Sequence, residues 1–156
     1  MPAGQGTAIH CLMIPLSNDI LLLPNAAVAE VSAYLPPESP GDAPDWYLGQ
    51  TTWRDYRIPV VAFELLNGDV SGKVTVTKNS RIAVLNTLNG NPRLPYIGLL
   101  TQGIPRLQVV QNKSLEANSS MEGRHDTCVA EFVLVNGEPV TIPDIDFLEK
   151  SLVELS

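Results

Sequence analysis

The sequence predicts an all-β protein with two minor helices, and three observations support this class. Short apolar runs follow one another closely and are separated by turn residues, a spacing typical of β-barrels and β-sandwiches. Asn136-Gly137 lies between two such runs, and Asn-Gly is the strongest short-range hairpin signal because both residues tolerate positive φ. No helical segments alternate with the strands, which argues against a parallel α/β sheet.

The chain opens with a predicted hairpin. Residues 8–16 and 20–23 are apolar and are expected to form two strands, joined by the turn residues at 17–19. A short helix is expected after Pro24, with Asn25 as its N-cap. In that helix Ala27, Val28 and Val31 would share one face.

A proline-rich loop at 36–44 precedes a second predicted hairpin, whose strands span 46–52 and 57–65. Both faces of the second strand are apolar, so it is expected to be buried on both sides. The remaining strands are expected at 81–88, 96–102, 106–111, 127–135 and 138–142. Residues 67–80 and 113–126 are expected to be loops, the latter with room for a helical turn. The total is about eight or nine strands.

A final helix is expected to begin at Pro143-Asp144, with Asp144 as the N-cap. Its apolar residues recur at helical spacing, namely Ile145, Leu148, Leu152 and Leu155. A helix this short needs tertiary support, so this stripe is expected to dock on the body of the protein.

Composition indicates one globular domain over residues 7–156, preceded by a flexible N-terminus at 1–6. Of the 156 residues 44% are hydrophobic and 17% are charged, which is globular composition. The net charge is −7 and the pI is about 4.7. Nucleic-acid surfaces need clustered Lys and Arg, so nucleic acid is not an expected partner.

The N-terminal residues lack the features of a signal peptide, and no apolar run approaches the roughly 18 residues that a membrane-spanning helix needs. A cytoplasmic protein without direct membrane insertion is therefore expected. Cys11 and Cys128 both lie in apolar runs and are interpreted as reduced core thiols, although the sequence leaves their pairing open.

No constellation for catalysis is found. His10 and His125 are the only histidines, and no further ligands stand near them at metal-binding spacing. Motifs for an activated serine, a zinc protease or a phosphate loop are missing. Asp144 and Asp146 are interpreted as capping residues at a helix start. We therefore expect no catalytic, metal or cofactor site, and not an enzyme.

The tip of the second hairpin has the composition of a contact surface. Trp53, Arg54, Asp55, Tyr56 and Arg57 are consecutive there, and Trp, Tyr and Arg are enriched at interface hot spots. The alternative is structural: the two aromatic rings close the end of a barrel while the arginines are merely solvated.

The ordered motifs of residues 20–65 resemble the CheW-like chemotaxis coupling-protein family. They are the 25–31 segment (NAAVAEV), the 43–49 segment (APDWYLG), Trp53-Arg54 and the 58–61 segment (IPVV). The resemblance implies two packed, SH3-like, five-stranded β-barrel lobes. It also implies a cytoplasmic adaptor that joins chemoreceptors to a CheA-type histidine kinase in membrane receptor arrays.

In this family the kinase carries a regulatory domain of the same fold, which pairs with the adaptor barrel to barrel. The cytoplasmic tip of the chemoreceptor docks in the groove between the lobes. By motif position Arg54 matches the family's coupling arginine and Gly49 the glycine of the preceding strand. The expected partner-binding residues are Gly49, Trp53, Arg54, Asp55 and Tyr56.

Three residues depart from the family pattern. Asp55 replaces a glycine, Trp53 replaces an aliphatic residue, and Ala62 stands where aspartate is common. These changes favour a divergent coupler of the kind that serves type IV pilus chemosensory systems and twitching motility.

Two other classes stay open. A small-ligand-binding or enzymatic β-barrel would have an enclosed pocket of at least roughly 300 Å³ with converging polar groups. A self-assembling structural protein would sediment as an oligomer.

Overall fold

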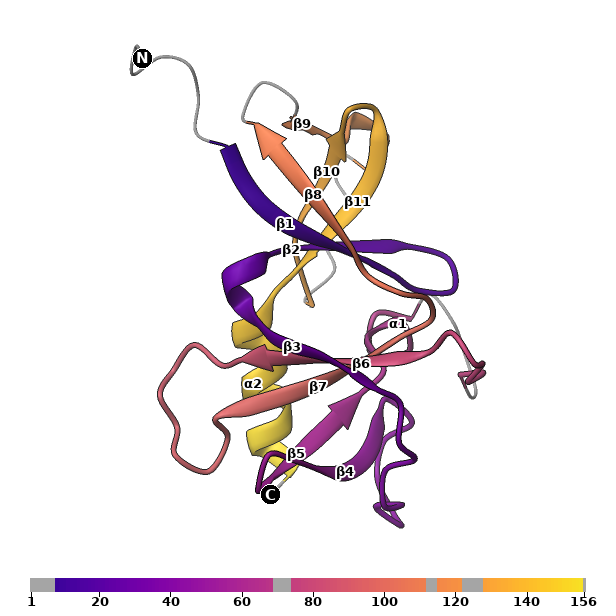
Figure 1. Cartoon of the computed structure of the whole chain (residues 1–156), viewed down its shortest axis with the longest axis vertical. Helices are drawn as coiled ribbons and strands as arrows, with labels where there is room; N and C mark the ends of the chain where they lie inside the picture. Colours follow the sequence, from indigo (N-terminus) through magenta and orange to yellow (C-terminus); the bar gives the residue numbers. More distant parts are fainter. Residues whose placement is uncertain (1–7, 69–73, 112–114, 122–127, 156) are drawn as a thin grey trace.

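The computed structural model describes residues 8–68, 74–111, 115–121 and 128–155. Within these ranges the strands form two sheets. One has the order β8-β1-β2-β11-β10-β9 and the other has the order β3-β6-β7-β5-β4. Figure 1 shows the six-stranded sheet above the five-stranded sheet, with helix α2 beside the latter. The expected all-β class with two lobes is confirmed, and one lobe adds a short sixth strand, β9, to the five expected.

The six-stranded sheet combines the two ends of the chain. Its strands are β1 (Ala8–Pro15), β2 (Ile20–Pro24), β8 (Arg106–Gln111), β9 (Leu115–Ala117), β10 (Val129–Val135) and β11 (Glu138–Pro143). Two of the three predicted hairpins, β1–β2 and β10–β11, are present in this sheet. A parallel bridge between Thr141 and Leu21 joins them into one sheet.

The five-stranded sheet is formed by the middle of the chain. Its strands are β3 (Val28–Ala33), β4 (Tyr47–Trp53), β5 (Tyr56–Val61), β6 (Arg81–Asn86) and β7 (Tyr96–Thr101). β4 and β5 form the second predicted hairpin, and β5 pairs in parallel with β7. β3 and β4 are the outer strands of this sheet.

The short helix expected after Pro24 is present only as a single 3-10 turn, and its expected extension to Val31 and its Asn25 cap are wrong. Only a 3-10 turn, η2 (Asn25–Ala27), follows Pro24, and the Asn25 side chain caps nothing. The next residues form β3, in which Val31 pairs with Ala83 of β6. A short alanine-rich segment has a weak local preference for helix, and a full ladder of pairs with β6 outweighs it.

The strand expected at 57–65 is shorter than predicted. β5 ends at Val61, and a one-turn helix, α1 (Phe63–Leu66), follows it. Burial on both faces is confirmed for 58–61, where every residue is buried. The loop expected at 113–126 contains β9 and a 3-10 turn, η4 (Ser119–Met121). The expected flexible residues 1–6, parts of the two expected loops, and His125 lie outside the described residues.

A central apolar cluster holds the two sheets and α2 (Ile145–Leu155) together. It includes Leu21 of β2, Phe63 of α1, Leu99 of β7 and Leu148 of α2. The Asp144 carboxylate accepts the backbone N–H of Phe147 at 3.0 Å, so the predicted N-cap is confirmed. Docking is confirmed for three residues of the stripe, whereas Leu155 is 41% exposed.

The two cysteines are separate and buried, as expected for reduced core thiols. Cys11 packs inside the six-stranded lobe, whereas Cys128 belongs to the central cluster. Burial raises the pKa of the Cys11 thiol, which favours the unreactive protonated form.

Candidate protein-interaction site

The tip of the β4–β5 hairpin adopts a tight two-residue turn. Trp53 and Tyr56 are its closing pair, and the turn residues Arg54 and Asp55 have φ angles of 46° and 68°. Two successive positive φ angles match the twist of the flanking strands. This conformation suits glycine and asparagine and costs free energy for other residues. Arg54 therefore holds a left-handed position that its side chain disfavours, and Asp55 holds one that aspartate tolerates less well than glycine does.

Trp53 closes the apolar interior of the five-stranded lobe. Its side chain packs with Ile58, Val60, Ile82 and Val84, and it is 8% exposed. Its ring centroid lies 4.8 Å from that of Tyr96 and 6.4 Å from that of Tyr56. Within the described structure the buried Trp53 Nε1 has no hydrogen-bond partner. The structural interpretation of the indole ring therefore holds for Trp53.

Tyr56 and Arg54 present the accessible part of this cluster. Tyr56 is 45% exposed, and its ring lies 5.1 Å from that of Tyr96. The guanidinium carbon of Arg54 lies 4.9 Å from the centroid of the Trp53 ring, within the range of a cation–π contact. Arg54 Nη2 also donates to Glu30 Oε1 at 2.7 Å. The Arg54 side chain is 68% exposed, so it is oriented on two sides yet open to a partner.

Arg57 is oriented in a similar way. Its Nη2 lies 3.0 Å from Glu38 Oε2, and both side chains are exposed. Neither arginine of the tip is merely solvated. Exposed ion pairs contribute little to stability, so their main effect is to position the guanidinium groups.

Gly49 shapes the hairpin from within. It is buried and has a φ of 120°. A Cβ atom at Gly49 would lie 1.8 Å from the carbonyl oxygen of Glu38. The Glu38 backbone N–H also donates to the carbonyl oxygen of Gln50 at 2.8 Å. Gly49 thus lets the proline-rich loop cross β4 closely, and it offers no side chain to a partner.

Sequence reasoning missed Glu30 and Tyr96. Glu30 reaches Arg54 only because residues 28–33 form a strand, whereas the sequence predicted a helix there. Tyr96 joins the aromatic cluster from β7, far along the chain. No local signal points to either residue.

Exposed apolar side chains accompany the site on the outer strands of both sheets. Val31 of β3 is 37% exposed, and Leu107 and Val109 of β8 are 60% and 45% exposed. Apolar side chains of this size on outer strands are typical of interaction surfaces.

A polar hollow of about 690 Å³ lies between the β1–β2 turn and β11. A small-ligand-binding domain would use such a space. Three of its polar side chains have partners within the protein: the Thr141 hydroxyl donates to Asp19 Oδ2 at 2.7 Å, and Glu138 pairs with Arg106 of β8 at 3.2 Å. The described residues contain no group of three or more His, Cys, Asp or Glu side chains that could hold a metal ion. In the same part of the chain, no helix has the length and apolar character needed to cross a membrane.

Comparisons with known proteins identify the family to which this architecture belongs. The structure is similar to the crystal structure of the scaffolding protein TtCheW from Thermoanaerobacter tengcongensis, with a TM-score of 0.74. The two sequences are 19% identical, and the match covers 95% of this chain and 92% of that chain. A search of curated proteins found no significant match. The family model of the CheW-like domain matches residues 10–152. This chain therefore belongs to the CheW-like domain family.

Proposed function

We propose that this protein is a non-catalytic adaptor that couples the cytoplasmic tip of a chemoreceptor to the regulatory domain of a CheA-type histidine kinase. The observation that carries the proposal is Arg54, an exposed guanidinium that Trp53 and Glu30 hold in place on a CheW-like fold. An interface anchor that is oriented before binding loses little conformational entropy when it binds.

The receptor tip is a helical hairpin, and we assign its contact to the surface that runs from the β4–β5 tip to β3 and β8. Arg54 and Tyr56 supply polar and aromatic anchors. Val31 and Leu107 supply apolar contacts on the outer strands of the two lobes. An amphipathic helix would lay its apolar face on these side chains, which is the helix-in-groove mode of recognition.

The contact with the like-folded kinase domain is assigned to the apolar strand edge at β4. This strand is one of the two outer strands of the five-stranded sheet; the bridge between Glu38 and Gln50 covers part of its edge, and Tyr47 and Leu48 of β4 are only partly buried. The two partners would then bind different faces of one rigid body. The complex would exist in more than one arrangement, and binding of either partner would shift the equilibrium between these arrangements.

The direct test of the kinase contact is a pull-down with the regulatory domain of the cognate kinase. Retention of the folded protein at micromolar concentration supports the adaptor function. The absence of binding at high micromolar concentration contradicts it.

A substitution tests the receptor contact. Arg54→Ala is expected to weaken binding of the receptor tip by more than about 1 kcal/mol, as a hot-spot residue does. The melting temperature should hardly change, because the ion pair with Glu30 is exposed. Arg57→Ala is the matched control, since it removes a paired arginine from the same hairpin. A large loss of stability in Arg54→Ala would instead indicate a structural role.

A further inference from the structure

A second concave surface lies away from the Arg54 turn, where the last turn of α2, the β6–β7 loop and the β4–β5 hairpin meet. Its volume is about 450 Å³. The apolar part of its lining consists of Tyr47, Pro59, Leu94, Leu152, Val153 and Leu155. Val153 and Leu155 are 47% and 41% exposed. A partner that covered such side chains would remove apolar surface from water, which is favourable. We call this surface the α2 groove.

The α2 groove carries positive charge, whereas the chain as a whole is negatively charged. Arg57 and Arg93 line it, whereas none of its lining residues, all of them in the described part of the chain, is acidic. The chain as a whole has a net charge of −7. Arg93 is exposed, and the Glu38 side chain that pairs with Arg57 is 75% exposed. Water screens such an exposed pair, so Arg57 can still attract an anionic group.

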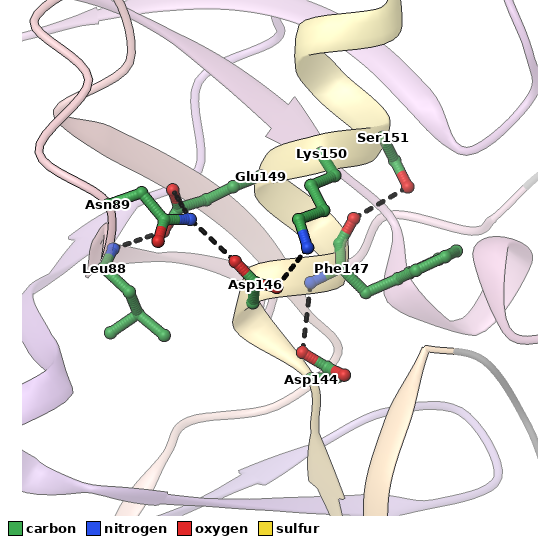
Figure 2. Close-up of polar contacts among 8 residues, drawn as sticks. All are labelled: Leu88, Asn89, Asp144, Asp146, Phe147, Glu149, Lys150 and Ser151. Carbon is green, nitrogen blue, oxygen red and sulfur yellow. Dashed lines mark hydrogen bonds and ion pairs between the residues drawn. The ribbon is translucent and has the colours of Figure 1, made fainter.

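One wall of the groove is held rigidly by α2. This wall is the β6–β7 loop, which protrudes on the left of Figure 1. Figure 2 shows how the helix holds it: the Glu149 carboxylate accepts the backbone N–H of Leu88, and it accepts the Asn89 amide at 2.8 Å. Asp146 Oδ1 accepts the same amide at 2.7 Å. Glu149 is only 3% exposed and its two bonds are partly buried, whereas the bond between Asn89 and Asp146 is exposed.

Two further contacts help to hold the β6–β7 loop in place. The Thr87 hydroxyl donates to the carbonyl oxygen of Leu94 at 2.7 Å and fixes the other end of the loop. Lys150 pairs with Asp146 at 2.9 Å. Hydrogen bonds from Lys150 and Asn89 lower the pKa of the Asp146 carboxyl, which therefore stays charged and keeps its hold on the loop. The groove is thus formed before any partner arrives, which reduces the entropy cost of binding.

We propose that the α2 groove binds an extended peptide segment of a partner protein, in which acidic side chains flank a large apolar side chain. The apolar side chain would cover Val153 and Leu155, and the carboxylates would meet Arg57 and Arg93. Carboxylates suit these positions because arginine forms paired, charge-assisted hydrogen bonds with them. A groove of this volume has room for a few side chains only, so a short linear segment is the fitting partner. The inference does not depend on the receptor and kinase contacts.

The test uses two synthetic peptides that differ only in charge, one with a Glu-Leu-Asp-Leu core and one with a Lys-Leu-Lys-Leu core. Each is titrated into isotope-labelled full-length protein, and the amide signals are followed by NMR. The acidic peptide should shift the signals of Asn91, Arg93, Leu94 and residues 152–155, and the lysine peptide should not.

Substitutions then locate the site. Arg93→Ala should weaken binding of the acidic peptide by about tenfold, and Val153→Ser should weaken it as well. Lys78→Ala is the matched control, because it removes one positive charge from an exposed position outside the groove and should leave the affinity unchanged. Thermal unfolding of each variant verifies that it is folded.

Several results would overturn the proposal. They are equal binding of both peptides, signal shifts confined to other surfaces, an Arg93→Ala variant that binds like the wild type, or no binding at about 1 mM peptide. Sedimentation could instead reveal a dimer that Val153→Ser dissociates. A second copy would then occupy the groove, and the proposal would be wrong.

Discussion

The hairpins β4–β5 and β10–β11 turn in the same way but with very different residues. Asn136 and Gly137 have φ angles of 51° and 84°, close to those of Arg54 and Asp55. Asn-Gly adopts this turn at low cost, and nothing approaches within 4 Å of the position of a Cβ on Gly137. The β10–β11 turn is therefore specified by its own two residues.

The Arg54-Asp55 turn lacks this local advantage and is held by contacts with distant residues. Trp53 packs on Tyr96 and Arg54 pairs with Glu30. Backbone strain that the surrounding structure maintains is a feature of functional sites. The comparison shows that one turn is favoured by its own residues, whereas the other is held by contacts with distant residues; under the proposed function, the strained turn is the one that presents Arg54.

The largest effect is expected at the contact that holds the strained turn. Trp53→Ala should lower the free energy of unfolding by about 3–5 kcal/mol, because it removes a buried aromatic side chain. Urea denaturation measures this loss. Tyr56→Ala, at a half-exposed ring, serves as the control and should cost less. If both variants lost equally little free energy of unfolding, the turn would not depend on the aromatic cluster.

The next effect comes from moving the strained residues to the other hairpin. The double variant Asn136→Arg with Gly137→Asp should lose about 1–3 kcal/mol, because these residues gain left-handed strain there without compensating contacts. The loss is measured by denaturation next to the single variant Asn136→Asp, which tolerates the turn. If the double variant were as stable as the wild type, Arg and Asp would not be strained in this turn, and the two hairpins would not differ in the way described.

The reverse exchange should stabilise the protein. Arg54→Asn with Asp55→Gly is expected to raise the free energy of unfolding by about 1 kcal/mol, since it relieves the strain. The same variant should bind the receptor tip more weakly, because the arginine is lost. Thermal unfolding and binding are measured on the same sample. A gain in stability without any loss of binding would mean that the turn has no function in binding.

The smallest effect is expected for the ion pair itself. Glu30→Gln should change stability by less than about 1 kcal/mol, since both partners are exposed. It should nevertheless loosen Arg54, which NMR of the guanidinium group would detect as faster motion. Glu38→Gln, in the exposed pair with Arg57, is the control and should leave Arg54 unaffected.

The parts of the fold that could be predicted from the sequence are those with local causes. Turn chemistry at 17–19 and at Asn136-Gly137 predicted two hairpins, and the Asp144 cap predicted the start of α2. β3 was predicted as a helix because its strand conformation depends on pairing with β6, which lies more than forty residues further along the chain.

The same division applies to the candidate surfaces. The members of the hairpin tip are consecutive in the sequence, so their proximity could be predicted. The α2 groove could not, because it joins residues from Tyr47 to Leu155. One signal did point to the hydrogen bonds by which α2 holds the β6–β7 loop. Glu149 lies within the apolar stripe of α2, four residues after Ile145 and one after Leu148. A carboxylate at a buried helical position needs donors from elsewhere in the fold.

The arrangement of the two sheets sets an order in which the protein can assemble during translation. Every strand of the five-stranded sheet lies between residues 28 and 101, so this lobe can close before synthesis ends. Of the described strands, β1 and β2 are synthesised before all others, yet their neighbours β8 and β11 come after the whole five-stranded sheet. The apolar face of the β1–β2 hairpin therefore stays uncovered until β8 and β11 have been synthesised. Helix α2 then covers the part of that face that belongs to the central apolar cluster. Among the strands of this domain, the β1–β2 hairpin is thus the one most exposed to aggregation and to chaperones.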